Sequence, residues 1–241
     1  MKKVLFLFAA MLLVMTGANA QRTYVLAVGV AHYKDSANNL NHSDQDAIRM
    51  QKLMNQHYRD VTVMTSSYAT HDGIMDRLRK ICKQSKSKDR IVFYFSGHGF
   101  SRGIVGYDTF ILFDELIREL QKAKAGTKIC MIDACKSGAI VSQEGGTATW
   151  SSLAADTNTV FVLACRGEEL SAESPVVGAG LFTNALLKAL RGLADENQDK
   201  SITMEEMFRY VYGDVVKHSK GKQHPQLIAT KRMRNSAFLS W

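Results

Sequence analysis

The chain has 241 residues and a formal net charge of +8, with 46% hydrophobic residues, four cysteines and two prolines. This length is sufficient for one sizeable α/β domain, and so few prolines give no sign of a linker to a second domain. The basic residues are scattered, and their densest cluster, at 217–222, contains no interleaved aromatic residues, so we expect no nucleic-acid partner.

Residues 1–20 have the pattern of a secretory signal peptide. Lys2 and Lys3 form a positively charged start, residues 4–15 are apolar, and Ala18 and Ala20 frame a small-residue cleavage site. The alternative is a membrane anchor, but the apolar run is short for a bilayer span. We therefore expect cleavage after Ala20, a secreted or periplasmic protein made of a single domain at 21–241, and no membrane contact after cleavage.

From residue 21 onward, short apolar runs alternate with segments of helical periodicity. The predicted strands cover residues 24–30, 61–64, 91–95, 128–132, 159–164 and 226–230. The predicted helices cover residues 44–58, 70–85, 113–123, 180–190 and 203–216. Ser43 or Asp44 is the expected N-cap of the first helix. This alternation predicts an α/β fold, with helices on both faces of a mainly parallel sheet. Residues 136–158, rich in small and polar residues, predict a long exposed loop of functional importance.

Two polar segments directly follow the third and fourth predicted strands. The first, Ser-Gly-His-Gly, contains His98, and the second, Asp-Ala-Cys-Lys-Ser-Gly, contains Asp133 and Cys135. Ligands of open α/β sheets bind outside the carboxyl ends of the strands, so we expect His98 and Cys135 to face one cleft. An imidazole beside a thiol can take its proton and produce a thiolate nucleophile. Each residue alone is better explained as part of the core, but together they indicate a base and a nucleophile.

These two segments resemble the histidine and cysteine motifs of the caspase-like cysteine peptidases, specifically of the bacterial metacaspase-like branch. Four further segments resemble that family in the expected order: 25–30, 44–47, 180–183 and 223–226. The resemblance implies a caspase-like three-layer sandwich around a six-stranded sheet, and an endopeptidase that acts on peptides or proteins. It implies His98 as catalytic base, Cys135 as nucleophile, the backbone amides of Gly99 and Cys135 as the oxyanion hole, and no required third side chain.

Cys165 is the competing nucleophile, because its segment Ala-Cys-Arg-Gly resembles the cysteine motif of animal caspases. It lies 67 residues after His98 (165 − 98), whereas Cys135 lies only 37 residues after it (135 − 98), at the end of the next strand. We therefore assign the nucleophile to Cys135 and place Cys165 at the end of the fifth strand, beside the cleft. Cys82 and Cys130, on a predicted helix and strand, are expected to be buried and inert.

The resemblance also implies an acidic pocket that selects Arg or Lys before the cut. Asp133 and Glu173 match acidic positions of the family, Asp46 is a weaker third candidate, and carboxylates pair well with a guanidinium group. A turn-capping role for Asp133 and a solvated position for Glu173 are the alternatives. Arg166 would instead favour an acidic substrate residue. No Lys or Arg stands between 136 and 166, so a basic preference excludes a cut inside that loop except at Lys136 itself and predicts a single-chain enzyme that does not mature there.

Residues 195–206 match most of an EF-hand calcium loop, but Lys200 stands where the sharp turn requires glycine. The alternative, which we prefer, is that Thr203 and Glu206 form a capping box at the start of the last long helix. The acidic cluster that binds calcium in many metacaspases is reduced to Asp108 within residues 100–113. We therefore expect no bound metal, no cofactor and activity that is independent of calcium.

Two other classes of function stay open at this point. The first is a catalytically silent caspase-like scaffold that acts as a binding protein, although the chain retains both His98 and Cys135. The second is a thiol redox protein, which the lack of a Cys-x-x-Cys pair disfavours. Oligomeric state is unknown from the sequence.

Overall fold

The computed structural model describes residues 21–135, 137, 155–167, 169, 171, 173–174 and 179–241. Its centre is a six-stranded sheet with the order β12-β8-β7-β3-β1-β2, in which only the edge strand β12 runs antiparallel to its neighbour. The strands are β1 (Thr23–Gly29), β2 (Asp60–Thr65), β3 (Arg90–Ser96), β7 (Thr127–Asp133), β8 (Thr159–Leu163) and β12 (Gln226–Ile228). The predicted mainly parallel sheet is therefore confirmed.

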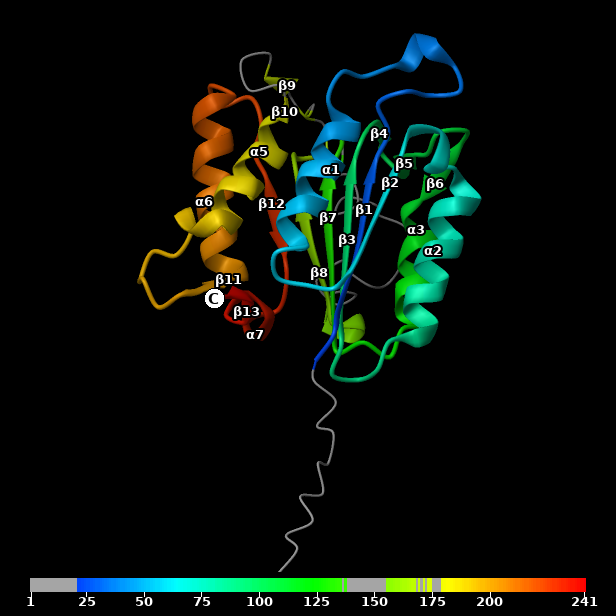
Figure 1. The fold of residues 1–241 in the computed structure, drawn as a ribbon. Coiled ribbons are helices and arrows are strands. Elements are labelled where there is room, and N and C mark those ends of the chain that lie inside the picture. Colours follow the sequence, from blue (N-terminus) through cyan, green and yellow to red (C-terminus); the bar gives the residue numbers. More distant parts are fainter. Residues whose placement is uncertain are drawn as a thin grey trace, which may run out of the picture.

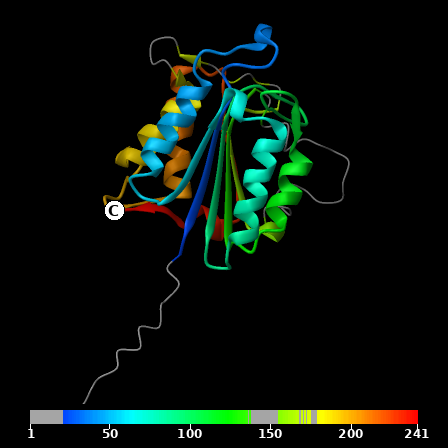
Figure 2. The same ribbon diagram turned by 45° about the vertical axis from the view of Figure 1, so that its right-hand side comes forward.

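Helices cover both faces of this sheet, as Figures 1 and 2 show. One face carries α1 (Ser43–Met54), α5 (Leu181–Lys188), the π-helical turn η4 (Ala189–Leu193) and α6 (Met204–His218). The other face carries α2 (His71–Gln84) and α3 (Phe113–Gln121). The shorter helices are η1 (Ser36–Asn38), η2 (Ser66–Tyr68) and α7 (Lys231–Arg234). The alternating pattern correctly predicted helices on both faces, and the three-layer sandwich that the resemblance implies is the observed architecture.

The central strands are buried on both faces, which explains why they are continuous apolar runs. Along β3, Ile91, Phe93 and Phe95 pack into the core beneath α2 and α3. Val92 and Tyr94 point the other way, into the core beneath α1, α5 and α6. This alternation follows from the two-residue period of a strand. The carboxyl ends of the five parallel strands therefore lie at one edge of the sheet, and the loops that follow them gather there.

Three small sheets were not predicted. Their strands are β4 (Gly99–Phe100), β5 (Gly103–Val105) and β6 (Phe110–Leu112), β9 (Glu173–Ser174) and β10 (Ala179–Gly180), and β11 (Ser201–Thr203) and β13 (Ala237–Ser240). The first of these sheets follows the histidine segment immediately. Residues of this sheet line a cavity that also contains His98.

The start of α1 differs from the prediction. His42 precedes the helix and makes no capping bond, so neither Ser43 nor Asp44 is the N-cap. The carboxylate of Asp44 instead accepts the backbone N–H of Ala31 at 2.9 Å and the hydroxyl of Ser66. These bonds fix the chain where it leaves β1. The helix also ends at Met54, four residues earlier than predicted (58 − 54).

Two sequence predictions lie largely outside the described residues. The proposed signal peptide at 1–20 is entirely outside them, and of the loop at 136–158 only Ser137 and residues 155–158 are inside. Within the part of the chain that is described, no helix has the length and apolar character needed to cross a bilayer.

Candidate active site

The register of the sheet brings the two predicted motifs to one place. Ser96 and Asp133, the last residues of β3 and β7, are paired neighbours, and the N–H of Gly97 donates to the carbonyl of Asp133 at 3.1 Å. His98 and Cys135 each come two residues later, and both line one small cleft of about 80 Å³. Because the parallel strands β3 and β7 end at the same level, the imidazole and the thiol lie at the same edge of the sheet.

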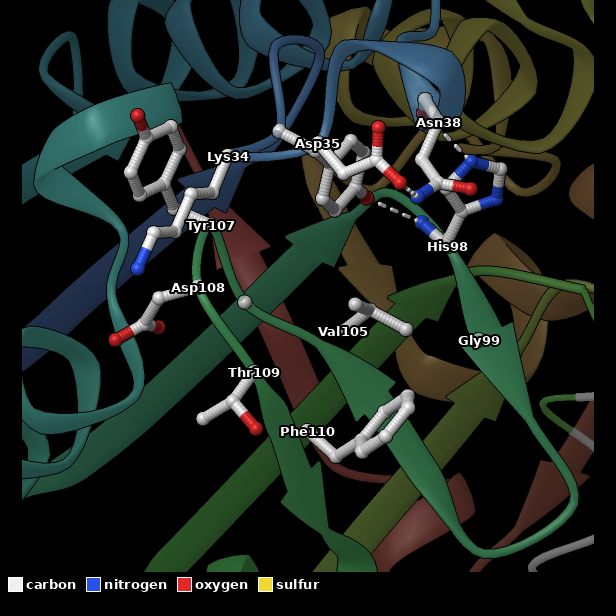
Figure 3. A pocket seen from close by; sticks show the side chains of 12 residues that line it. Lys34, Asp35, Asn38, His98, Gly99, Val105, Tyr107, Asp108, Thr109 and Phe110 are labelled. Atoms are coloured by element: carbon white, nitrogen blue, oxygen red, sulfur yellow. Dashed lines mark hydrogen bonds between the residues drawn. The ribbon is translucent and has the colours of Figure 1, made fainter.

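Two groups of the loop after β1 hold His98. Its backbone N–H donates to the Tyr33 hydroxyl at 2.7 Å, and the two rings lie 5.0 Å apart. Its Nε2 lies 2.9 Å from the backbone carbonyl of Asn38, a contact drawn in Figure 3. A carbonyl can only accept, so this bond assigns the ring proton to Nε2 and leaves Nδ1 with the lone pair of a base. Neither Tyr33 nor Asn38 was predicted.

Cys135 is half-buried, and its Sγ lies 4.0 Å from the backbone carbonyl of Ser171. The histidine loop packs directly against the cysteine loop, because a Cβ at Gly99 would lie only 2.7 Å from the carbonyl oxygen of Cys135. Only glycine fits this approach. The backbones of Gly99 and Cys135, the two predicted oxyanion donors, are therefore close neighbours.

Two carboxylates lie in the same cleft behind the thiol. Asp133 is 5% exposed, and its carboxylate accepts the Ser171 hydroxyl as well as the backbone N–H and hydroxyl of Thr183 at 3.1 and 2.6 Å. Thr183 belongs to the segment at 180–183, and the sequence alone did not show that this residue binds Asp133. These donors hold the Asp133 side chain in one orientation in the wall of the cleft. Its carboxylate also supplies negative charge there.

Asp46, on α1, is the second carboxylate and is 1% exposed. Its Oδ2 accepts the N–H of Gly180 at 3.1 Å and the Ser96 hydroxyl at 3.4 Å. No described atom hydrogen-bonds its Oδ1, although Arg49 lies 3.8 Å away. Burial, helped by the nearby charge of Asp133, raises the pKa of Asp46 to about 8. The cleft therefore holds an acid that a bound cation would ionise.

The remaining predicted residues have different positions. Glu173 lies in β9, opposite Gly180 of the cleft in the β-ladder. Arg166 is exposed and is not among the described residues that line the cleft. Cys165 is buried, and its thiol donates to the carbonyls of Ala134 and Glu169 at 3.4 and 3.3 Å. It thus lies beyond the end of β8, behind the cysteine loop.

The other cysteines match their predicted roles. Cys82 and Cys130 are buried, none of the four cysteines forms a disulfide, and burial raises the pKa of the Cys82 thiol to about 12. These thiols are therefore inert at neutral pH. A redox role by paired thiols has no support in this arrangement.

The candidate calcium loop is organised around the helix that follows it. Thr203 and Glu206 form the predicted capping box, with the Thr203 N–H donating to Glu206 at 2.8 Å and the Glu206 N–H donating to the Thr203 hydroxyl at 3.2 Å. Asp195 accepts the N–H groups of Asp199 and Lys200. Over the described ranges, no group of three or more His, Cys, Asp or Glu side chains is arranged to hold a metal ion.

Comparison with known proteins agrees with this architecture. The sequence model of the caspase domain matches residues 22–235. No curated protein matches the chain. The crystal structure of a protein from Geobacter sulfurreducens has a TM-score of 0.69 at 17% identity, over 91% of this chain and 98% of that one. Caspase-1 from Spodoptera frugiperda has a TM-score of 0.68 at 15% identity, over 90% and 91% respectively.

Proposed function

We propose that this chain, which belongs to the caspase domain family of cysteine peptidases, is an endopeptidase that uses Cys135 as nucleophile and His98 as base. The observation that carries this proposal is their placement, each two residues beyond the paired strand ends Ser96 and Asp133 and on one cleft. The hydrogen bond from Nε2 of His98 to Asn38 supports it, because this bond leaves Nδ1 free to take a proton.

The reaction follows the chemistry of a thiol and an imidazole. Cys135 gives its proton to His98, and its Sγ attacks the carbonyl carbon of the scissile peptide bond. The carbon–nitrogen bond then breaks, the leaving amine takes the proton from His98, and a thioester to Cys135 remains. Water hydrolyses this thioester and restores the thiol. The backbone N–H groups of Gly99 and Cys135 are the proposed donors to the oxyanion.

The proposed specificity is for Arg or Lys immediately before the cut. Two buried carboxylates, Asp46 and Asp133, lie in the cleft beside Cys135, and the exposed Arg166 does not line it. A cationic side chain would relieve the repulsion between the two acids and would find an acceptor in Oδ1 of Asp46. Glu173 is a third proposed contributor through its place opposite Gly180. This pocket chemistry also favours the metacaspase-like branch of the family.

Export is proposed on the sequence alone. The pattern of residues 1–20 supports cleavage after Ala20 and a mature enzyme in the periplasm or outside the cell. Calcium independence is likewise proposed, from the acidic residues missing around Asp108.

The test of the proposed function is covalent labelling by a peptide that ends in an electrophilic arginine derivative. The mature enzyme should be labelled at Cys135, and hydrolysis of an arginyl reporter peptide should fall to background in Cys135→Ala and His98→Ala. Cys165→Ala is the matched control, because it removes a buried thiol outside the cleft and should leave labelling intact. Labelling that persists in Cys135→Ala would refute the assignment, and a folded protein that is neither labelled nor active would be a silent scaffold.

A further inference from the structure

A second and larger cavity lies on the other side of His98. It has a volume of about 640 Å³ and is lined by His98 together with Tyr33, Val105, Tyr107 and Phe110, among others. Figure 3 shows these walls, with Phe110 and Val105 on the small sheet that follows the histidine. The volume is within the range of binding pockets for small molecules, so there is room for a large side chain. His98 is shared by this cavity and by the cleft of Cys135.

The walls of this cavity are held by backbone hydrogen bonds. The N–H of Val105 donates to the carbonyl of His98 at 3.0 Å, and the N–H of Lys34 donates to the carbonyl of Tyr107 at 2.9 Å. The N–H of Tyr107 donates in turn to the carbonyl of Ala69 at 2.8 Å. These bonds tie the small sheet both to the histidine loop and to the loop after β1. The cavity is therefore preformed and needs no movement of these segments to exist.

The proposed reaction indicates which part of the substrate this cavity would hold. The acyl side of the substrate occupies the cleft that contains Asp46 and Asp133 beside Cys135. The leaving amine receives its proton from His98 and must therefore lie against that ring. The part of the substrate that follows this amine therefore runs to the far side of His98, where the larger cavity lies.

We propose that this cavity binds the side chain of the first residue after the cut and selects a large apolar or aromatic residue at that position. This inference rests on the proposed function. The walls contributed by Val105, Tyr107 and Phe110 are apolar or aromatic, and Phe110 is left 60% exposed at the rim. The two carboxylates of the cavity are already engaged, since Asp35 accepts the N–H of Ala37 and Asp108 accepts the N–H of His71.

Burial of an aromatic side chain against these walls removes apolar surface from water, which an alanine or a charged residue cannot do to the same extent. Differences of this kind in an apolar pocket change kcat/KM by roughly tenfold to a hundredfold. The selectivity acts on acylation, because the residues after the cut leave with the amine. Hydrolysis of the thioester should not depend on them.

The test uses internally quenched peptides that are identical up to the arginine and differ only in the following residue. We expect kcat/KM for the peptide with phenylalanine after the cut to exceed that for alanine by roughly tenfold or more, with aspartate lower still. Phe110→Ser should reduce this ratio several-fold. Leu193→Ser is the matched control, because Leu193 is similarly exposed at 62% but lies beyond the opposite face of the sheet. It should leave the ratio unchanged.

An electrophilic arginine derivative with no group beyond the reactive carbon separates this inference from the proposed function. It fills only the acyl side, so Phe110→Ser should be labelled at Cys135 as fast as the unmodified enzyme. Normal labelling together with equal kcat/KM for the phenylalanine and alanine peptides would overturn the inference and leave the function standing. An unmodified enzyme that is neither labelled nor able to cleave the peptides would overturn both the inference and the proposed function.

Discussion

At the residue scale, the feature with the clearest consequence is the buried carboxyl of Asp46. Its Oδ2 is held by Gly180 and Ser96, while Oδ1 has no hydrogen-bond donor among the described residues. Its pKa is raised to about 8 by burial and then by Asp133, so the group is mostly neutral at pH 7 in the free enzyme. A guanidinium group in the cleft favours the ionised form. Binding of an arginyl substrate below pH 8 should therefore release a proton from Asp46.

The first prediction concerns the ratio of kcat/KM for an arginyl peptide to that for its neutral isostere, the citrullyl peptide. Titration of the catalytic pair affects both peptides and cancels in the ratio. Between about pH 6 and pH 9 the ratio should rise by roughly tenfold. At low pH the arginyl substrate has to displace the proton of Asp46 in order to bind, whereas at high pH Asp46 is already ionised. In Asp46→Asn the ratio should be low and independent of pH.

The matched control for this prediction is Asp76→Asn, which removes an exposed carboxylate on α2, on the opposite face of the sheet. Its ratio should follow the unmodified enzyme at every pH. A ratio that does not change with pH in the unmodified enzyme would exclude Asp46 as the partner of the substrate cation. Faster cleavage of an aspartyl peptide than of the arginyl peptide would end the proposal of a basic specificity altogether.

The residues found from the sequence and those missed differ in a physical way. Asp133 is the last residue of an apolar strand, and His98 and Cys135 each come two residues after such a strand, so predicting the strand ends also located these side chains. Tyr33 and Asn38 come from an irregular loop with no periodicity. Their contacts with His98 span 65 and 60 residues of sequence, and no local pattern could show them.

At the scale of secondary-structure elements, the start of α6 decides between two interpretations of one sequence. Thr203 and Glu206 cap the helix reciprocally, and Glu206, which would be the twelfth residue of a calcium loop, is bonded to Thr203. Lys200 has a φ of 63°, in the left-handed region that glycine prefers. The turn therefore forms without glycine, and the cap accounts for Glu206 without calcium.

The second prediction is that Thr203→Ala lowers the free energy of unfolding by about 1 kcal/mol, because the helix loses its N-cap acceptor. Thr203→Ser keeps the hydroxyl and should retain most of the stability. Urea denaturation followed by circular dichroism measures both. Calcium should leave the midpoint of the unmodified enzyme unchanged. A midpoint that rises with calcium and loses this response in Asp195→Asn would show that the loop is an ion site.

Most of the elements that were predicted correctly are long ones. Strands β3 and β7 are seven residues long with a mostly apolar centre, so the sequence predicts their type, and the predicted limits are one residue short at each end. The strands of the small sheet at 99–112 are two or three residues long, which is too short for a two-residue period to be recognised. The helix predicted at 180–190 passes at Ala189 into a π-helical turn that contains Gly192 at φ 108°.

At the scale of the whole molecule, the alternation of strands and helices predicted the layers but not the order of the strands. The order β12-β8-β7-β3-β1-β2 places β3 and β7 side by side at the centre, with β1 next to β3. The loops after these three strands build the site, which is why the loop after β1 supplies partners for His98. Pairing between distant strands depends on packing over the whole core, and a single sequence shows it only through resemblance to a family.

The last prediction concerns the covalent state of the mature enzyme. A basic specificity requires Lys or Arg before each cut, and residues 137–165, between the cysteine strand and the end of the fifth strand, contain neither. The active enzyme should therefore show no cut within residues 137–165, and Lys136 is the only position of the loop after β7 where a cut after a basic residue could occur. Intact-mass spectrometry after prolonged incubation measures this, and turnover of an arginyl reporter in the same sample shows that the enzyme is active. Self-cleavage within 137–165 that disappears in Cys135→Ala would contradict the basic specificity, because the enzyme would then be cutting after an uncharged or acidic residue.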